Sequence, residues 1–193
     1  MEGPDGKIVN EILTEDARPA TAAGGGSISE TAGASTAEIA VIRREGHRVP
    51  PGDSAEQRDA ERVMLDLLGR DLGLALEPAT IAVASGARVE IDGCDASRTV
   101  LVECWAHQGP PKPAQRNKVL ADVLKLTWIA TTIYPRPRLI VCMSDPLAAA
   151  PFLPPARSWA ARALQDFAIA VHVVDLPAGI RERVRAAQQR QYR

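Results

Sequence analysis

The feature that most constrains the fold is an apolar run that ends in a carboxylate. Residues 99–106 read Thr-Val-Leu-Val-Glu-Cys-Trp-Ala, and a short run of this kind predicts a strand buried in a sheet. Glu103 lies within it, and a carboxylate so close to a buried region needs a partner or a metal ion. The chain must therefore build a sheet that accommodates an acid beside its core.

Helical and strand patterns alternate around this strand. Three antiparallel strands followed by helix-linked strands predict an α/β fold with a mixed sheet flanked by helices. Trp128 and Trp159 stand at helical spacing from apolar neighbours, which favours core positions for both. Gly93 to Ser97 is expected to form a turn. The other expected elements are helices over 55–76, 113–131, 157–167 and from 178 onward, and strands over 80–83, 88–92, 138–143 and 169–174.

The first 52 residues differ in composition from the rest. Residues 17–40 are mostly Ala, Gly, Ser and Thr, including three consecutive glycines, and such a segment has little to bury. Residues 1–53 also hold nine Asp and Glu against five Lys and Arg. We therefore predict a flexible, acidic, low-complexity segment over 1–52 and an α/β domain over 53–193.

Composition excludes several classes of protein. The chain has 193 residues and a formal net charge of −1, with no run near the roughly 20 apolar residues that a membrane span needs. Its three cysteines form no CxxC pair, which disfavours a disulfide framework. No phosphate-binding loop, dinucleotide-binding glycine motif or nucleophile elbow is present. These observations predict a reduced, cytoplasmic protein that does not associate with membranes.

Two carboxylates are candidates for chemistry. Strand alternation places Glu103 and Trp105 on one face of their strand, and Asp92 on the strand before it. If the two strands form a hairpin, Asp92 and Glu103 converge, and paired carboxylates bind Mg²⁺ while leaving positions for water and phosphate oxygens. The ordinary explanation of Asp92 is that Asp-Gly is a favoured turn pair.

These elements resemble a known superfamily. A first helix, Ile91-Asp92-Gly93, and Val102-Glu103-Cys104-Trp105 followed by a helix are similar to the restriction-endonuclease-like, PD-(D/E)XK, phosphodiesterases. The resemblance covers residues 55–143 and implies an αβββαβ core, with an additional C-terminal strand and helices. It also implies that Asp92 and Glu103 are catalytic and bind Mg²⁺ or Mn²⁺, with Glu61 on the first helix as a further metal ligand.

The sequence departs from the pattern of that superfamily at one position. Trp105 stands where the superfamily has a lysine two residues beyond the second acid. The resemblance implies that the following helix supplies the lysine, and Lys112 and Lys118 are available there, with Gln115 as a loosely matching glutamine. Gln115, Lys118, Asp122 and Lys125 form one stripe of this helix, although a charged stripe is most often a solvated face.

The leading hypothesis is a metal-dependent, nuclease-like hydrolase, an endo- or exonuclease whose partner is DNA. Arg181, Arg183 and Arg185 would contact the phosphate backbone. The alternative is a catalytically inactive nuclease-fold module that binds nucleic acid or a partner protein, with Trp105 filling the lysine position. A third reading makes the carboxylates structural. The oligomeric state is left open, with a dimer among the alternatives.

Overall fold

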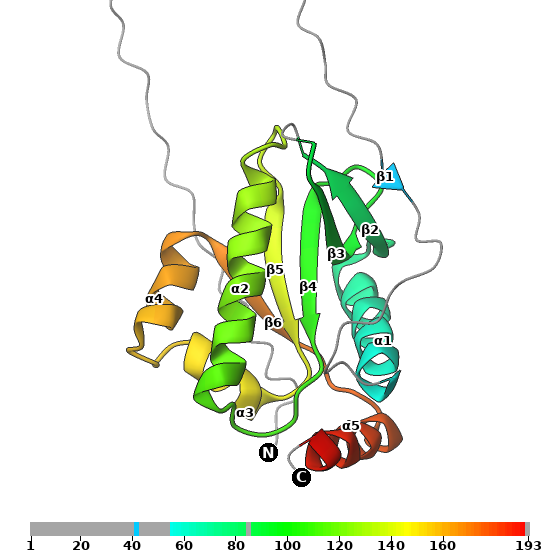
Figure 1. Cartoon of the computed structure of the whole chain (residues 1–193), viewed down its shortest axis with the longest axis vertical. Helices are drawn as coiled ribbons and strands as arrows, with labels where there is room; N and C mark the ends of the chain where they lie inside the picture. Colours follow the sequence, from blue (N-terminus) through cyan, green and yellow to red (C-terminus); the bar gives the residue numbers. More distant parts are fainter. Residues whose placement is uncertain (1–40, 43–54, 84–85, 192–193) are drawn as a thin grey trace, which may run out of the picture. The chain divides into compact units, whose positions relative to one another are not determined.

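The computed structural model describes residues 41–42, 55–83 and 86–191, which form an α/β fold (Figure 1). The sheet has six strands in the order β1-β2-β3-β4-β5-β6. β1 to β4 pair antiparallel, whereas β4, β5 and β6 are parallel. The predicted mixed sheet is therefore confirmed. The strands are β1 (Val41–Ile42), β2 (Glu77–Ala82), β3 (Arg88–Cys94), β4 (Val100–Trp105), β5 (Arg138–Met143) and β6 (Ile169–Val173).

Helices cover both faces of this sheet. The helical elements are α1 (Ala55–Leu72), α2 (Pro113–Ala130), α3 (Pro146–Ala149), a 3₁₀ turn η1 (Ala150–Phe152), α4 (Trp159–Asp166) and α5 (Ala178–Gln191). One apolar core joins α2, α3, η1 and α4 to the sheet, and a second joins α1 and α5 to its opposite face. α2 runs along β4 and β5 in Figure 1. The predicted segment 1–52 lies outside the described residues, apart from β1.

β4 is buried along its whole length and divides its side chains between the two cores. Leu101 and Trp105 belong to the core beneath α2, whereas Val102 and Cys104 belong to the core beneath α1. Because alternate residues of a strand share a face, Glu103 lies on the α2 side. The strand therefore places a carboxylate directly under a helix.

β3 contains a bulge at Asp92 and Gly93, which corrects the interpretation of this pair as a turn. Ala79 pairs with Ile91 and Glu77 pairs with Cys94, so Asp92 and Gly93 together oppose Pro78. A bulge inserts one extra residue, bends the strand and redirects a side chain. Proline lacks the N–H that a regular ladder would use at this position. The Asp-Gly pair thus lies inside a strand.

The turn itself lies further along the chain and is organised by Asp95. Its carboxylate accepts hydrogen bonds from the Ser97 N–H at 3.2 Å, the Thr99 hydroxyl at 3.0 Å and the Val100 N–H at 2.8 Å. Asp95 is buried, so these bonds replace the water it gives up. They connect β3 to the start of β4 and hold the pair in register.

The expectation that two tryptophans lie in the core is wrong. The side chain of Trp128 is 43% exposed and that of Trp159 is 72% exposed. Val119, Val123 and Leu126 form the buried side of α2, and Trp128 lies on the side that faces away. Helical spacing from apolar residues does not distinguish an inner from an outer stripe when a helix is apolar on both sides. No helix of the described residues is long and apolar enough to cross a membrane.

Candidate functional site

β3 and β4 part at the two predicted carboxylates. Their pairing consists of Gly93 opposite Val102 and Cys94 opposite Leu101, and it stops there. Beyond this point the Asp92 carboxylate accepts a hydrogen bond from the Cys104 backbone N–H at 2.8 Å. The side chain of Asp92 therefore accepts the hydrogen bond of a β4 N–H group at the point where backbone pairing between β3 and β4 has ended. This strand fork is the local structure that brings Asp92 next to Glu103.

Glu103 lies in the fork with only 5% of its side chain exposed. The Lys125 ammonium from α2 is 2.6 Å from its Oε1 atom. The Oε1 atom is buried against this ammonium group. Burial and the nearby Asp92 raise the pKa of Glu103 to about 9, although Lys125 acts in the opposite direction. The structure thus keeps an acid in a position that costs free energy.

α2 supplies an alternating row of charges above this acid. Asp122 lies between two lysines, 3.7 Å from the Lys118 ammonium and 3.9 Å from the Lys125 ammonium. Burial raises the pKa of Asp122, with the lysines opposing that change. Burial alone would lower the pKa of Lys118, but the carboxylates of Asp122, Glu61 and the two fork residues raise it. Acids from α1, β3, β4 and α2 therefore act on one lysine.

The structure brings together some of the predicted site residues. Asp92, Glu103 and Lys118 belong to one electrostatic cluster, which Glu61 reaches from α1. Lys125 contacts Glu103 directly, yet sequence reasoning placed it only in the charged stripe of this helix. Its signal was the spacing of three and four residues that it shares with Lys118 and Asp122.

Lys112 and Gln115 lie at the start of α2 instead. Lys112 is the N-cap residue, and its backbone N–H donates to Gln115 Oε1 at 2.7 Å. The Gln115 amide nitrogen lies 3.4 Å from His107 Nδ1. Six residues along a helix correspond to about 9 Å of rise, which separates Lys112 from Lys118. These two residues shape the beginning of the helix, and the lysines of the cluster come from its middle.

Trp105 occupies an apolar space beside the cluster. It is 5% exposed and packs in the core with Val119 and Val123 of α2. Its ring stacks on that of His107 with centroids 4.6 Å apart and planes 5° from parallel. Burial lowers the pKa of His107, although Asp145 opposes this change. Trp105, at the lysine position of the superfamily pattern, is therefore part of the core. The ammonium that contacts Glu103 is that of Lys125, on α2.

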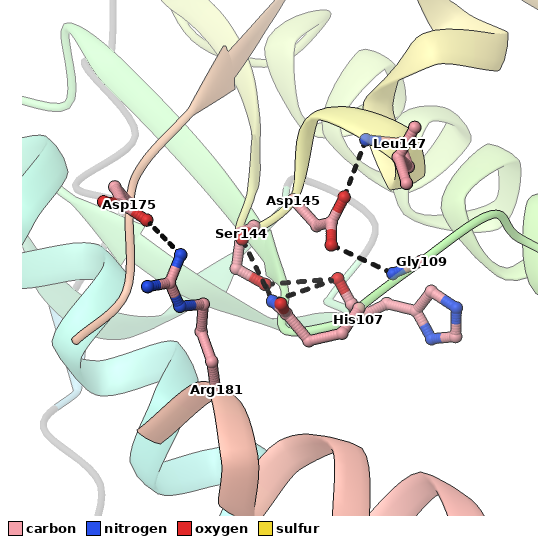
Figure 2. Close-up of polar contacts among 8 residues, drawn as sticks. His107, Gly109, Ser144, Asp145, Leu147, Asp175 and Arg181 are labelled. Carbon is pink, nitrogen blue, oxygen red and sulfur yellow. Dashed lines mark hydrogen bonds and ion pairs between the residues drawn. The ribbon is translucent and has the colours of Figure 1, made fainter. Parts of the chain in front are cut away.

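A second polar group joins the loops that follow β4 and β5 (Figure 2). The Gln108 amide donates to the Ser144 carbonyl at 3.0 Å and to its hydroxyl at 2.9 Å. The Asp145 carboxylate accepts the Gly109 N–H at 3.0 Å and the Leu147 N–H at 2.7 Å. Because these polar groups satisfy one another, their role is to hold the loop that leads into α2.

The predicted arginines lie on a different element from the fork. Arg181 donates to Asp175 at 2.9 Å, as Figure 2 shows, while Arg183 and Arg185 are exposed on α5. α5 packs against α1. A nucleic-acid contact by these arginines stays a prediction.

The fork offers carboxylate oxygens, which are the type of ligand that a hard divalent cation prefers. Asp92 and Glu103 supply these oxygens, and the Oε1 atom of Glu103 lies 2.6 Å from the Lys125 ammonium. Within the described part of the chain, no group of three or more His, Cys, Asp or Glu side chains is arranged to hold a metal ion. An ion such as Mg²⁺ needs no such group, because it keeps several waters and binds through one or two carboxylates.

Comparison of the chain with models of protein families, with curated proteins and with solved structures gives no match.

Proposed function

We propose that the strand fork is the active site of a metal-dependent phosphodiesterase of the restriction-endonuclease-like type that acts on DNA. The observation that carries the proposal is the buried carboxylate of Glu103, which shares the fork with Asp92 and lies 2.6 Å from the Lys125 ammonium. Two acids and a lysine in one strand fork are groups that metal-assisted phosphodiester hydrolysis can use.

The acids of the cluster support a cation. The carboxyl groups of Glu61, Asp92, Glu103 and Asp122 all act electrostatically on Lys118. Asp92 and Glu103 would be the ligands of a bound Mg²⁺ or Mn²⁺. When bound, such an ion polarises the phosphate and lowers the pKa of a coordinated water.

Side chains of the chain itself are assigned the other roles in the site. Lys125 holds Glu103 and is 30% exposed, whereas Lys118 is 62% exposed and can reach a phosphate. Asp122 keeps the two ammonium groups apart and in place. Asp92 is fixed by the Cys104 N–H, which leaves its second oxygen for a ligand. We assign substrate contact to Lys118 and positioning of the acid to Lys125.

The test is cleavage of linear, circular and single-stranded DNA by the purified chain with Mg²⁺, Mn²⁺ or a chelator. Glu103→Gln keeps the size of the side chain and removes its ability to ionise and bind a metal ion, and we expect it to lower the rate at least 100-fold. Glu182→Gln, an exposed change on α5, is the matched control and should cleave like the wild type. Equal metal-dependent rates for wild type and Glu103→Gln would contradict the assignment.

A second candidate function is a catalytically inactive module of the same fold that binds nucleic acid or a protein. The observation that favours it is that the Lys125 ammonium already lies 2.6 Å from Glu103 Oε1, where a metal ion would bind. If this candidate is right, the chain cleaves no substrate, and Glu103→Gln binds DNA with the same affinity as the wild type. Measuring DNA binding alongside cleavage separates the two functions.

A further inference from the structure

The Lys125 ammonium lies between two acids that differ in exposure. It is 2.6 Å from Oε1 of Glu103, whose side chain is 5% exposed, and 3.9 Å from Oδ1 of Asp122, whose side chain is 18% exposed. Glu103 belongs to β4, whereas Asp122 lies three residues before Lys125 on α2. The ammonium therefore has a buried carboxyl partner on the sheet and a more exposed one on its own helix.

The contact with Glu103 leaves no room for a second cation at the same oxygen. An ion such as Mg²⁺ lies about 2.1 Å from a carboxylate oxygen that binds it. An ion on Oε1 and the ammonium in its present position would therefore be at most about 4.7 Å apart. Two positive charges at this separation repel strongly where little water screens them, and Glu103 is buried. The Lys125 ammonium thus fills the place of a metal ion at this oxygen.

Lys125 can leave Glu103 without losing a carboxyl partner. Its side chain is 30% exposed, so it has a path toward solvent. Asp122 faces Lys118 with Oδ2, at 3.7 Å, and faces Lys125 with Oδ1. The 3.9 Å between Oδ1 and the Lys125 ammonium exceeds the length of a charge-assisted hydrogen bond by only about 1 Å. A small movement of one side chain therefore transfers the ammonium from the sheet to the helix.

We propose that Lys125 occupies the cation position of the strand fork in the metal-free chain and moves from Glu103 to Asp122 when a divalent cation binds. The inference rests on the proposed function, because it concerns the metal ion that the fork would bind. It adds that this ion competes with a lysine of the chain itself. Asp122 then influences the metal affinity of the fork as the residue that receives the displaced ammonium, without contacting the ion.

The first test is a double-mutant cycle measured by calorimetric titration of the full chain with Mn²⁺. We expect Asp122→Asn to lower the Mn²⁺ affinity at least fivefold when Lys125 is present, because the displaced ammonium then lacks this carboxylate. In the Lys125→Met background, the same change should alter the affinity less than twofold. Arg116→Gln removes an exposed charge of α2 and is the matched control, which should bind like the wild type. Circular dichroism confirms that each variant is folded.

The outcomes of this cycle separate the inference from the proposed function. An equal effect of Asp122→Asn in both backgrounds would overturn the transfer of Lys125, while the fork would still bind a metal ion. A wild type that binds no Mn²⁺ would contradict the proposed function, and this inference with it.

Reductive methylation of the lysines, measured by mass spectrometry, tests the movement itself. Because the Lys125 ammonium leaves a buried carboxyl for a more exposed one, we expect its labelling rate to rise at least threefold at saturating Mn²⁺. Lys112, at the N-terminal end of α2, shows whether the ion changes the labelling reaction in general. A Lys125 rate that stays the same while calorimetry shows bound Mn²⁺ would overturn the proposal.

Discussion

At the scale of single residues, Glu103 is the group whose position most needs an explanation. A carboxyl in the core beneath α2 destabilises the fold unless something compensates it. Lys125 provides part of that compensation, yet burial and Asp92 still raise the pKa of Glu103 to about 9. A residue that served stability alone would be better replaced by a neutral one. The position of Glu103 in the fork fits a role in binding or chemistry.

This raised pKa makes the free energy of unfolding depend on pH. Between pH about 4.5 and about 9, the folded chain keeps a proton that unfolded chains release, so stability falls as pH rises through this window. Glu103→Gln removes the titrating group. Relative to wild type, we expect the variant to gain about 1 kcal/mol per pH unit from pH about 5 to about 8.

Urea denaturation at several pH values, in the presence of a chelator, measures this difference. Glu182→Gln should follow the wild type at every pH, because its side chain is exposed on α5. If the free energy of unfolding changed with pH in the same way for wild type and Glu103→Gln, Glu103 would have an ordinary pKa. The conclusion that its burial in the fork destabilises the fold would then be wrong.

At the scale of elements, the bulge in β3 positions both the site and the helix behind it. Asp92 is directed into the fork, and Gly93 faces α1 on the other side of the sheet. A Cβ atom at position 93 would lie 2.3 Å from Leu65 Cδ1, which is closer than two carbon atoms can approach. The glycine therefore allows α1 to pack tightly against the bulged strand.

Gly93→Ala should consequently destabilise the chain by about 1–3 kcal/mol through overpacking. Gly179→Ala is the contrasting change, because nothing lies within 4 Å of a Cβ there and alanine favours a helix. Thermal or urea unfolding of the two variants checks the prediction. A Gly93→Ala variant as stable as the wild type would contradict the tight packing of α1 against position 93.

The order of helices and strands could be predicted from the sequence because hydrophobic periodicity is local. Helix α2 and strand β5 begin at the predicted residues, and both lie within long periodic or apolar runs. The bulge could not be predicted, since it depends on the register of β2 against β3 and on Pro78. The ion pair of Lys125 with Glu103 is likewise a tertiary contact, set by how α2 lies across β4.

At the scale of the whole molecule, α1 and α2 pack on opposite faces of the sheet that contains the strand fork. α1 brings Glu61 into electrostatic reach of Lys118, while α2 carries Lys118, Asp122 and Lys125.

Calorimetric titration with Mn²⁺ tests, without knowledge of the substrate, our proposal that the fork binds a divalent cation through Asp92 and Glu103. The account predicts one Mn²⁺ per chain for the wild type and an affinity at least tenfold weaker for Asp92→Asn. The asparagine oxygen can still accept the Cys104 N–H, so the fork is preserved. No binding by the wild type, or equal binding by both proteins, would contradict the account.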